Sequence, residues 1–281
     1  MTFSTCSDPV LRSLPPEPPL PGLPTWLDAP VVLNEHDRDR YWHLVLRAPA
    51  IAAAVRPGQF VMLTQAQADV QGPVLPRPMA VSHADAEAGT IVIRYAVVGR
   101  GTRLLTTARP GQTLVTVGPL GRPFDFAAEK RGRVLLLGRG IGICSLTLLG
   151  ARAVAAGHQV MAVSSARTRG SVIGTEHYRR SGVLVREVND DDGSSEIGEL
   201  AASLRAEYGL TPPFLVAACG SRRLIALASQ LGRDWGSDAQ VSVEAPMACG
   251  LGYCHGCATG VPSTAAESPL VCSDGPVFRC S

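Results

Sequence analysis

The chain of 281 residues contains a single lysine, Lys130, among its 26 basic residues. No glycine-rich G-x-x-x-x-G-K run leads into it, so the sequence excludes a P-loop nucleotide hydrolase and most chemistry that forms a Schiff base on lysine. Basic and acidic residues nearly cancel, leaving a net charge of +2. The chain therefore lacks the basic surface that a nucleic-acid partner requires.

Long apolar runs are also missing. None reaches the roughly 18 to 20 residues that a membrane-spanning helix needs. Residues 1–30 have neither a basic start nor an apolar core, so we expect no secretory signal peptide and no membrane association, but a cytoplasmic protein. Eight cysteines in a reducing compartment are more typical of a metal site than of disulfides, and five of them crowd residues 249–281.

Composition divides the chain into four parts. Residues 1–30 are rich in proline, which predicts an extended N-terminal segment without a helix. Residues 31–126 contain short β-runs separated by turns, which predicts a small antiparallel β-barrel. Residues 131–244 alternate strand and helix patterns, which predicts a doubly wound α/β nucleotide domain with a parallel sheet. We expect regular structure to end at Glu244, leaving residues 245–281 as a cysteine-rich loop segment.

Individual elements follow from the same patterns. In the barrel, strands are predicted at residues 41–46, 59–63, 90–97 and 113–117. In the α/β domain, strands are predicted at residues 133–138, 158–164, 182–188, 214–218 and 240–244. Helices are predicted between them at residues 143–156, 196–208 and 222–231. The chain is thus expected to be a β plus α/β protein.

The strongest motif is a run of cysteines with C-x4-C-x2-C spacing and a distant fourth member. Its members are Cys249, Cys254, Cys257 and Cys272. This is the spacing of plant-type [2Fe-2S] proteins, in which one tight loop supplies three thiolates and a remote residue supplies the fourth. Glycines at positions 250, 252 and 256 allow the backbone to bend and to direct N–H groups at the sulfurs.

Other metal centres fit this spacing less well. Zinc prefers paired C-x2-C elements, and only one such pair is present. A Rieske centre needs two histidines, and only His255 is local. We therefore predict an iron–sulfur cluster and keep zinc as the alternative, with Cys280 as a free thiol outside the pattern.

A second group of motifs lies in the barrel part. It consists of Arg77-Pro78-Met79-Ala80, then Arg94-Tyr95-Ala96, then Gly101-Thr102. An arginine fixed by a proline can pair with a diphosphate, an aromatic ring on the next strand can cover a flat ring, and a Gly-Thr turn can offer N–H groups to phosphate oxygens. Each motif taken alone is equally compatible with an ordinary barrel turn.

The α/β part carries glycines where a strand meets a helix. Gly138, Gly140 and Gly142 would present amide groups to an anion, or would simply allow a close strand–helix turn. Cys219-Gly220 ends a later strand, at the sheet edge where ligands bind, although Cys219 can equally be a small buried residue. After the second strand, Ser164, Ser165, Arg167 and Arg169 can hold a 2′-phosphate or form a polar loop.

The order of these motifs resembles the ferredoxin-reductase superfamily. Three segments resemble, more narrowly, the electron-transfer subunits of dihydroorotate dehydrogenase B, and the likeness extends over about residues 31–279. They are Glu244–Cys257, Cys272-Ser-Asp-Gly-Pro-Val-Phe278, and Gly118-Pro-Leu-Gly121 with Phe124. The chain departs from the family pattern at Ala80, Ala96, Cys144-Ser145 and Ser221, which fits a paralogue serving another dehydrogenase.

The resemblance implies a set of cofactors and a partner. It places FAD on residues 77–80, 94–96 and 101–102, the cluster on the four cysteines of the motif, and NAD(P) over the three glycines near Cys219-Gly220. It implies an oxidoreductase subunit that passes electrons between a flavoprotein dehydrogenase and NAD(P). A self-contained oxygenase-type reductase and a zinc-bound nucleotide-sensing module remain the alternatives.

Overall fold

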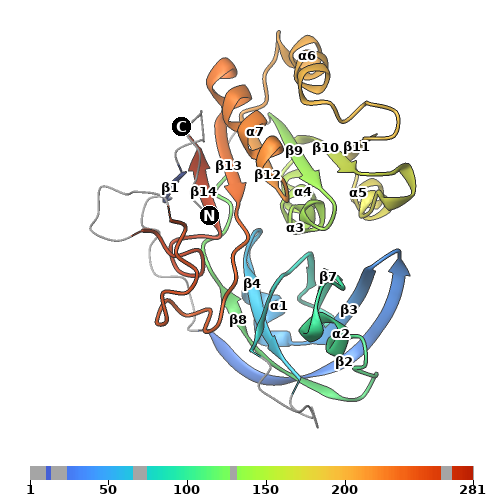
Figure 1. Ribbon diagram of the computed structural model, residues 1–281, viewed down its shortest axis with the longest axis vertical. Coiled ribbons are helices and arrows are strands. Elements are labelled where there is room, and N and C mark those ends of the chain that lie inside the picture. The colour runs from blue at the N-terminus through green and yellow to red at the C-terminus, as the bar shows by residue number, and fades with distance from the viewer. Residues whose placement is uncertain (1–10, 14–23, 66–74, 127–131, 261–267, 281) are drawn as a thin grey trace.

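The computed structural model describes residues 11–13, 24–65, 75–126, 132–260 and 268–280. Lys130 and most of the proline-rich segment at residues 1–30 lie outside the described residues. Two seven-stranded sheets account for the fold, one in a barrel-like domain and one in an α/β domain (Figure 1). Within the described ranges, no helix is long and apolar enough to cross a membrane.

The barrel sheet is antiparallel at every pairing, as predicted. Its strands, in the order β5-β4-β8-β2-β3-β7-β6, are β2 (Thr25–Arg38), β3 (Tyr41–Arg47), β4 (Phe60–Thr64), β5 (Arg77–Ala80), β6 (His83–Asp85), β7 (Thr90–Ala96) and β8 (Thr113–Leu120). Two short helices that the sequence did not predict, α1 (Pro49–Ala54) and α2 (Arg100–Leu105), connect them.

One boundary of the barrel differs from the sequence prediction. Residues 25–30, which the sequence placed in the extension, form the first half of β2 and pair with β8. Ala29 and Val31 are buried in the barrel core because alternate residues of β2 face inward. Pro30 is itself part of this strand, so the proline content of the segment does not prevent it from joining the sheet.

The second sheet has the order β1-β14-β13-β12-β9-β10-β11. Its parallel strands are β9 (Arg133–Arg139), β10 (Gln159–Ala166), β11 (Leu184–Asn189), β12 (Leu215–Cys219) and β13 (Asp238–Ser242). The helices are α3 (Gly142–Ser145), α4 (Thr147–Ala155), α5 (Thr175–Arg180), α6 (Ile197–Tyr208) and α7 (Arg222–Trp235). The predicted helix 143–156 is therefore split at Leu146, whose N–H bonds to the carbonyl of Ile143.

Regular structure does not end at Glu244, contrary to the prediction. Residues 277–280 form β14 (Val277–Cys280), which pairs antiparallel with β13 and, on its other side, with β1 (Leu11–Ser13). Val277 and Phe278 are fully buried. The hydrophobic stabilisation from burying them explains why the chain returns to this sheet after the cysteine segment. The cysteine segment is thus held at both ends by neighbouring strands of one sheet.

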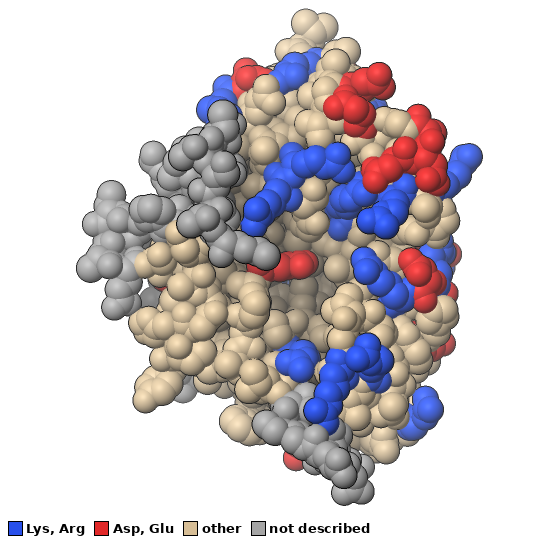
Figure 2. Space-filling view, in the orientation of Figure 1, with Lys and Arg blue, Asp and Glu red and all other residues tan. Residues whose placement is uncertain are grey.

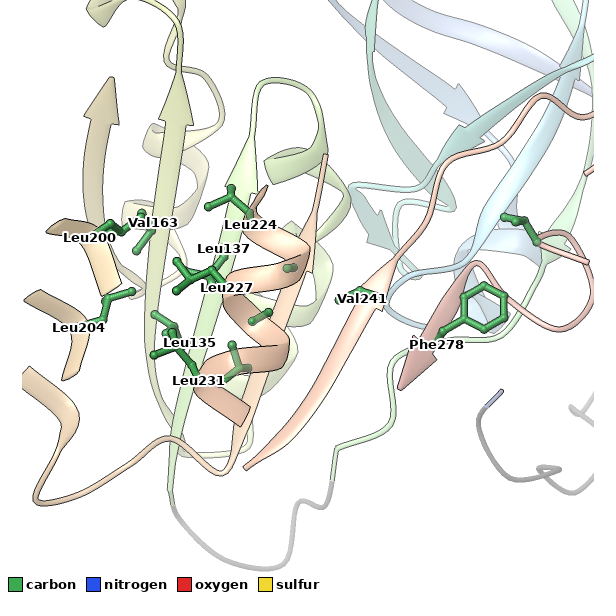
Figure 3. Packing of buried hydrophobic residues seen from close by; sticks show 14 of the residues in the cluster. Leu135, Leu137, Val163, Leu200, Leu204, Leu224, Leu227, Leu231, Val241 and Phe278 are labelled. Carbon is green, nitrogen blue, oxygen red and sulfur yellow. The ribbon is translucent and has the colours of Figure 1, made fainter. Parts of the chain in front are cut away.

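Helices cover both faces of this sheet. Leu135 and Leu137 of β9 point to the face covered by α6 and α7, whereas Val134 and Leu136 belong to the core on the opposite face. In Figure 3 the α7 side chains Leu224, Leu227 and Leu231, spaced by three and four residues, pack over β9. Burial on both faces explains why β9 is an unbroken apolar run rather than an alternating one.

Candidate functional site

A cavity of about 460 Å³ lies between the two domains and is walled on a third side by the chain that follows β13. Its lining from the barrel includes Arg77, Pro78, Met79, Ala80, Arg94, Tyr95, Ala96 and Thr102. The hollow is visible in Figure 2, with basic side chains on both of its sides. The structure therefore gathers most of the predicted flavin residues around a space of the size that a cofactor or a small ligand occupies.

Arg77 begins β5 and reaches from the barrel towards α2. A Cβ placed on Gly101 would lie 2.1 Å from Nε of Arg77, so the guanidinium lies directly against the glycine backbone. Among the described residues, its guanidinium makes one hydrogen bond, a long one of 3.4 Å from Nη1 to the carbonyl of Pro76. Among the described residues no carboxylate pairs with Arg77, and its charge is available to an anion in the cavity.

Arg94 and Tyr95 are placed differently. The Nη1 atom of Arg94 donates to Oδ2 of Asp37 at 2.6 Å, so its charge is already paired. Tyr95 points the opposite way along β7, into the barrel core, where its hydroxyl donates to Asn34 at 3.0 Å. Tyr95 also lines the cavity, so the expectation that its ring covers a flat ligand ring stays a prediction, with Arg94 and Ala96 next to it on the less buried side of the strand.

Gly101 and Thr102 lie in the first turn of α2 rather than in an open turn. The Oγ1 atom of Thr102 accepts hydrogen bonds from the backbone N–H groups of Val98 and Gly99, at 3.0 and 3.1 Å. This hydroxyl therefore caps the helix. Thr102 lies in the wall of the cavity. The lack of a side chain at Gly101 lets the guanidinium of Arg77 pack against the backbone of α2.

The third wall of the cavity was missed by sequence reasoning. It comprises residues 242–247, which leave the carboxyl end of β13. Within it, burial raises the pKa of Glu244 above its ordinary value. The sequence did contain one signal for this wall. Glu244 comes at the end of a predicted parallel strand, and ligands of such sheets bind at that edge.

The glycines of the α/β domain meet at the same edge of the sheet. A Cβ on Gly142 would lie 2.5 Å from Cα of Gly220, and one on Gly138 would lie 2.5 Å from Cα of Ile143. Close backbone packing alone therefore requires glycine at these positions. The glycines of this loop, with Gly140 at a φ of +54°, do not line the cavity themselves, whereas Ile141 and Ser145 beside them do.

Cys219 ends β12 at this edge, as the sequence predicted. Its side chain is fully buried, and that burial, with a smaller effect of Glu244, raises the pKa of the thiol to about 12. Cys219 is therefore a neutral, inaccessible packing residue, and only the turn at Gly220 borders the open edge.

The four cysteines of the motif are brought together as two pairs. The Sγ atoms of Cys257 and Cys272 are 3.2 Å apart. Cys249 interacts with Cys254; although burial raises the pKa of Cys249, hydrogen bonds from backbone N–H groups, chiefly that of Leu251, lower it to about 7. A thiol with a lowered pKa is closer to the thiolate form in which cysteine binds metals.

The loop backbone is shaped for these sulfurs. Gly252, at a φ of +80°, donates its N–H to Sγ of Cys272 at 3.1 Å. Gly250, at a φ of +71°, turns the chain so tightly against β4 that a Cβ there would lie 2.6 Å from Cγ of Met62. Both positions need glycine, for the backbone conformation that the sequence reasoning expected.

This donor set fits a two-iron cluster better than a single ion. Two pairs of thiols match two irons that each take two cysteines. Cys280 lies on β14 as a free thiol.

Comparison with known proteins agrees with these features. Residues 244–281 match the family model described as "Iron-sulfur cluster binding domain of dihydroorotate dehydrogenase B". The chain is 34% identical to "Dihydroorotate dehydrogenase B (NAD(+)), electron transfer subunit" of Geobacillus thermodenitrificans over 250 residues, 89% of this chain and 95% of the relative. It is 32% identical to the protein of the same name from Streptococcus thermophilus, over 89% of this chain and 95% of that relative.

Solved structures show the same architecture. A chain of NADH-dependent reduced ferredoxin-NADP oxidoreductase superposes with a TM-score of 0.74 at 25% identity, covering 90% of this chain and 88% of that one. The ferredoxin reductase of carbazole 1,9a-dioxygenase gives a TM-score of 0.61 at 19% identity, covering 76% and 66%, and shares the fold. The predicted fold and resemblance are confirmed: the chain belongs to the family of dihydroorotate dehydrogenase B electron transfer subunits.

Proposed function

We propose that this chain passes electrons between a partner flavoprotein dehydrogenase, of the dihydroorotate-oxidising kind, and NAD(P) through a [2Fe-2S] cluster and FAD. One structural observation carries the proposal. Residues 242–247 line the cavity, and Cys249 follows two residues after Met247 in the same stretch of chain. The wall of the cavity and the cluster loop are therefore continuous in the chain, which supports an arrangement with the two redox centres close to each other.

The barrel side of the cavity would hold the flavin. Arg77, with no carboxylate partner among the described residues, supplies a cation for the diphosphate, and Gly101 keeps its guanidinium in place. Met79 and Ala80 add apolar wall. When bound, FAD exchanges electron pairs with a nicotinamide and single electrons with a cluster.

The α/β side admits the nicotinamide nucleotide. Ile141 and Ser145 reach the cavity from the glycine loop, and Glu244 closes it from the opposite wall. Burial raises the pKa of Glu244 above its ordinary value, so this carboxyl takes up a proton at the cavity wall more readily than it would in water. The glycine loop and the turn at Gly220 present backbone to the rest of the nucleotide.

The cluster loop provides the surface for the partner. Tyr253 and Leu251, beside the cysteines, are 91% and 57% exposed. Exposed aromatic and aliphatic side chains of this kind are typical anchors of protein interfaces. The described cysteines are all free, which supports a reducing, cytoplasmic setting.

Co-expression with a dihydroorotate-oxidising flavoprotein subunit tests the proposal. The two chains should co-purify without oxygen and together reduce NAD(P) with dihydroorotate, whereas either chain alone should not. Cys254→Ser should abolish the coupled reaction, and Cys280→Ser should retain it. If no complex forms and the isolated chain reduces soluble acceptors at full rate, the chain is a self-contained reductase; stoichiometric zinc without sulfide would indicate the zinc-bound module instead.

A further inference from the structure

The cavity between the two domains does not reach the cysteines of the motif. None of the four, which all lie within the described ranges, belongs to the lining of the cavity. Cys257 and Cys272 are instead buried in an apolar cluster to which two buried residues of the lining, Phe60 and Met247, also belong. An electron that passes between a flavin in the cavity and a cluster on the cysteines therefore has to cross protein.

One stretch of the cavity wall leads directly to the first cysteine. Met247 lines the cavity and stands two residues before Cys249, so the Cα atoms of the two residues are at most about 7 Å apart. Beyond the last cysteine, Pro276 also lines the cavity, but it follows Cys272 by four residues, which allows a separation of up to about 14 Å. Met247 is thus the lining residue nearest in the chain to a cysteine of the motif.

The side chain of Met247 is turned into the protein rather than towards solvent. Within residues 243–249 Met247 is the only buried residue, with 9% of its surface exposed. These residues form no helix or strand. Packing of the methionine side chain against the apolar cluster therefore helps to hold this stretch of the cavity wall in place.

The protein around Met247 is tightly packed. A Cβ on Gly250 would lie 2.6 Å from Cγ of Met62, and one on Gly121 would lie 2.7 Å from Cε1 of Phe60. Phe60 and Met62 belong to the same apolar cluster as Met247 and are fixed on β4, which pairs with a strand on each side. Neighbours held in this way relax only partly when a side chain is shortened, so truncation of Met247 should leave a gap.

We infer that Met247 is a positioning residue for electron transfer, which fills the space between FAD and the cluster and keeps the two centres coupled through packed atoms. The inference rests on the proposed function, because it specifies how the two centres proposed there are connected. Each transfer moves one electron: one centre loses it, the other gains it, and no bond of Met247 forms or breaks. A gap slows such a transfer, because an electron tunnels less readily across empty space than through atoms in contact. The unbranched, polarisable side chain of methionine suits an irregular space of this kind.

A graded series of variants tests the inference in the full chain loaded with FAD and the cluster. Flash photoreduction of the flavin, without oxygen, starts the transfer, and absorbance follows reduction of the cluster. Met247→Leu conserves volume and should keep a rate close to that of the parent. Met247→Val and Met247→Ala should be progressively slower, with a severalfold loss for alanine. The midpoint potentials of both centres should stay unchanged, which shows that the driving force is not the cause.

Met161→Ala is the matched control for this series. Met161 lies on β10 and packs against the same apolar cluster, but it does not line the cavity. Its truncation should lower stability and leave the transfer rate unchanged. The absorption spectrum of oxidised FAD gives a readout that does not depend on electron transfer: it should change in Met247→Ala, where a contact with the flavin is lost, and not in Met161→Ala.

Three results would overturn the inference: a parental rate in Met247→Ala, a rate in Met247→Leu as low as that in Met247→Ala, or loss of FAD or iron from every shortened variant. The last result would make Met247 a residue that holds a cofactor rather than one that couples two. The proposed function fails in a different way. If the parent chain binds FAD and a cluster but passes no electron between them, the electron-transfer function itself is wrong.

Discussion

The guanidinium of Arg77 and the backbone of Gly101 are in such close contact that no side chain fits between them: a Cβ on Gly101 would lie 2.1 Å from Nε of Arg77. Gly101→Ala should therefore displace Arg77 while the backbone of α2 tolerates the change. Loss of one charge-assisted contact to the flavin diphosphate costs about 1.5 to 3 kcal/mol, so FAD affinity should fall by roughly ten- to a hundredfold. Fluorescence titration of the FAD-free protein with FAD measures this affinity.

Gly99→Ala is the matched control for this prediction. Gly99 precedes α2 in extended backbone, and a Cβ there would meet nothing within 4 Å. It should bind FAD as the parent does. If Gly101→Ala and Gly99→Ala bind FAD alike, Arg77 can move aside without loss and is not the diphosphate ligand.

The cysteine pairs predict the composition of the metal centre. Purified without oxygen, the chain should contain about two irons and two acid-labile sulfides. Cys254→Ser should lose both, because it breaks the pair with Cys249 on the exposed side of the loop. Cys280→Ser, on β14, should keep both. A Cys254→Ser protein with a full complement of iron would remove Cys254 from the ligand set.

Local patterns explain why some of this architecture was predictable. The apolar run of β9, from Val134 to Leu137, is buried on both faces, and such strands are recognisable without knowledge of their neighbours. The cysteine spacing is equally local, because three of its four members lie in one loop. The inward direction of Tyr95 follows from the two-residue period of β7, in which Tyr95 continues the buried series of Ile91 and Ile93.

Other features depend on partners distant in the sequence. Residues 25–30 become a strand because β8, almost ninety residues later, offers an edge to pair with. Val277 and Phe278 return to the sheet because β13 leaves its edge free beyond the cysteine segment. The cavity wall that holds Glu244 arises from the same long-range arrangement. Local periodicity in the sequence does not reveal such long-range pairings. The sequence therefore predicted the residue types of the site better than the walls that enclose it.

A histidine pair joins the two domains and makes their contact sensitive to acid. His83 of β6 and His177 of α5 have ring centroids 5.0 Å apart. Within the described structure, Nδ1 of His83 and Nε2 of His177 are buried without a hydrogen-bond partner. Burial, with the nearby positive groups His83 and Arg94 among others, lowers the pKa of His177 to about 4. The neutral ring is therefore the form that the folded protein prefers.

The sign of the resulting pH dependence follows from linkage. His177 titrates near 6.5 in the unfolded chain and near 4 in the folded one, so the unfolded state takes up the proton first as pH falls. Its contribution to stability is present above pH 6.5 and is lost as pH falls towards 4. His177→Phe keeps a ring and removes the titration, so its melting temperature should decrease less than that of the parent between pH 7 and 5. Parallel melting curves of the two proteins over this range would show that the pair does not titrate on unfolding.

The exposed side chains of the cluster loop give the last prediction, which concerns the partner. Tyr253 is 91% exposed and Leu251 57%, although both lie beside the cysteines whose cluster must approach the acceptor. If the dehydrogenase covers this loop, hydrogen exchange of residues 249–260 should slow markedly on complex formation, because the backbone N–H groups there become shielded from water.

Tyr253→Ala should weaken assembly by about tenfold or more, the effect typical of a buried aromatic anchor, and should leave FAD bound. Leu210→Ala is the control, since Leu210 is 99% exposed in the loop between α6 and β12, where no redox centre is proposed. Affinity for the dehydrogenase measured by interferometry should separate the two variants. If both assemble as the parent does, or if exchange in the loop is unaltered, the partner docks elsewhere, and electrons must leave this chain by a route other than the exposed side of its cysteine loop.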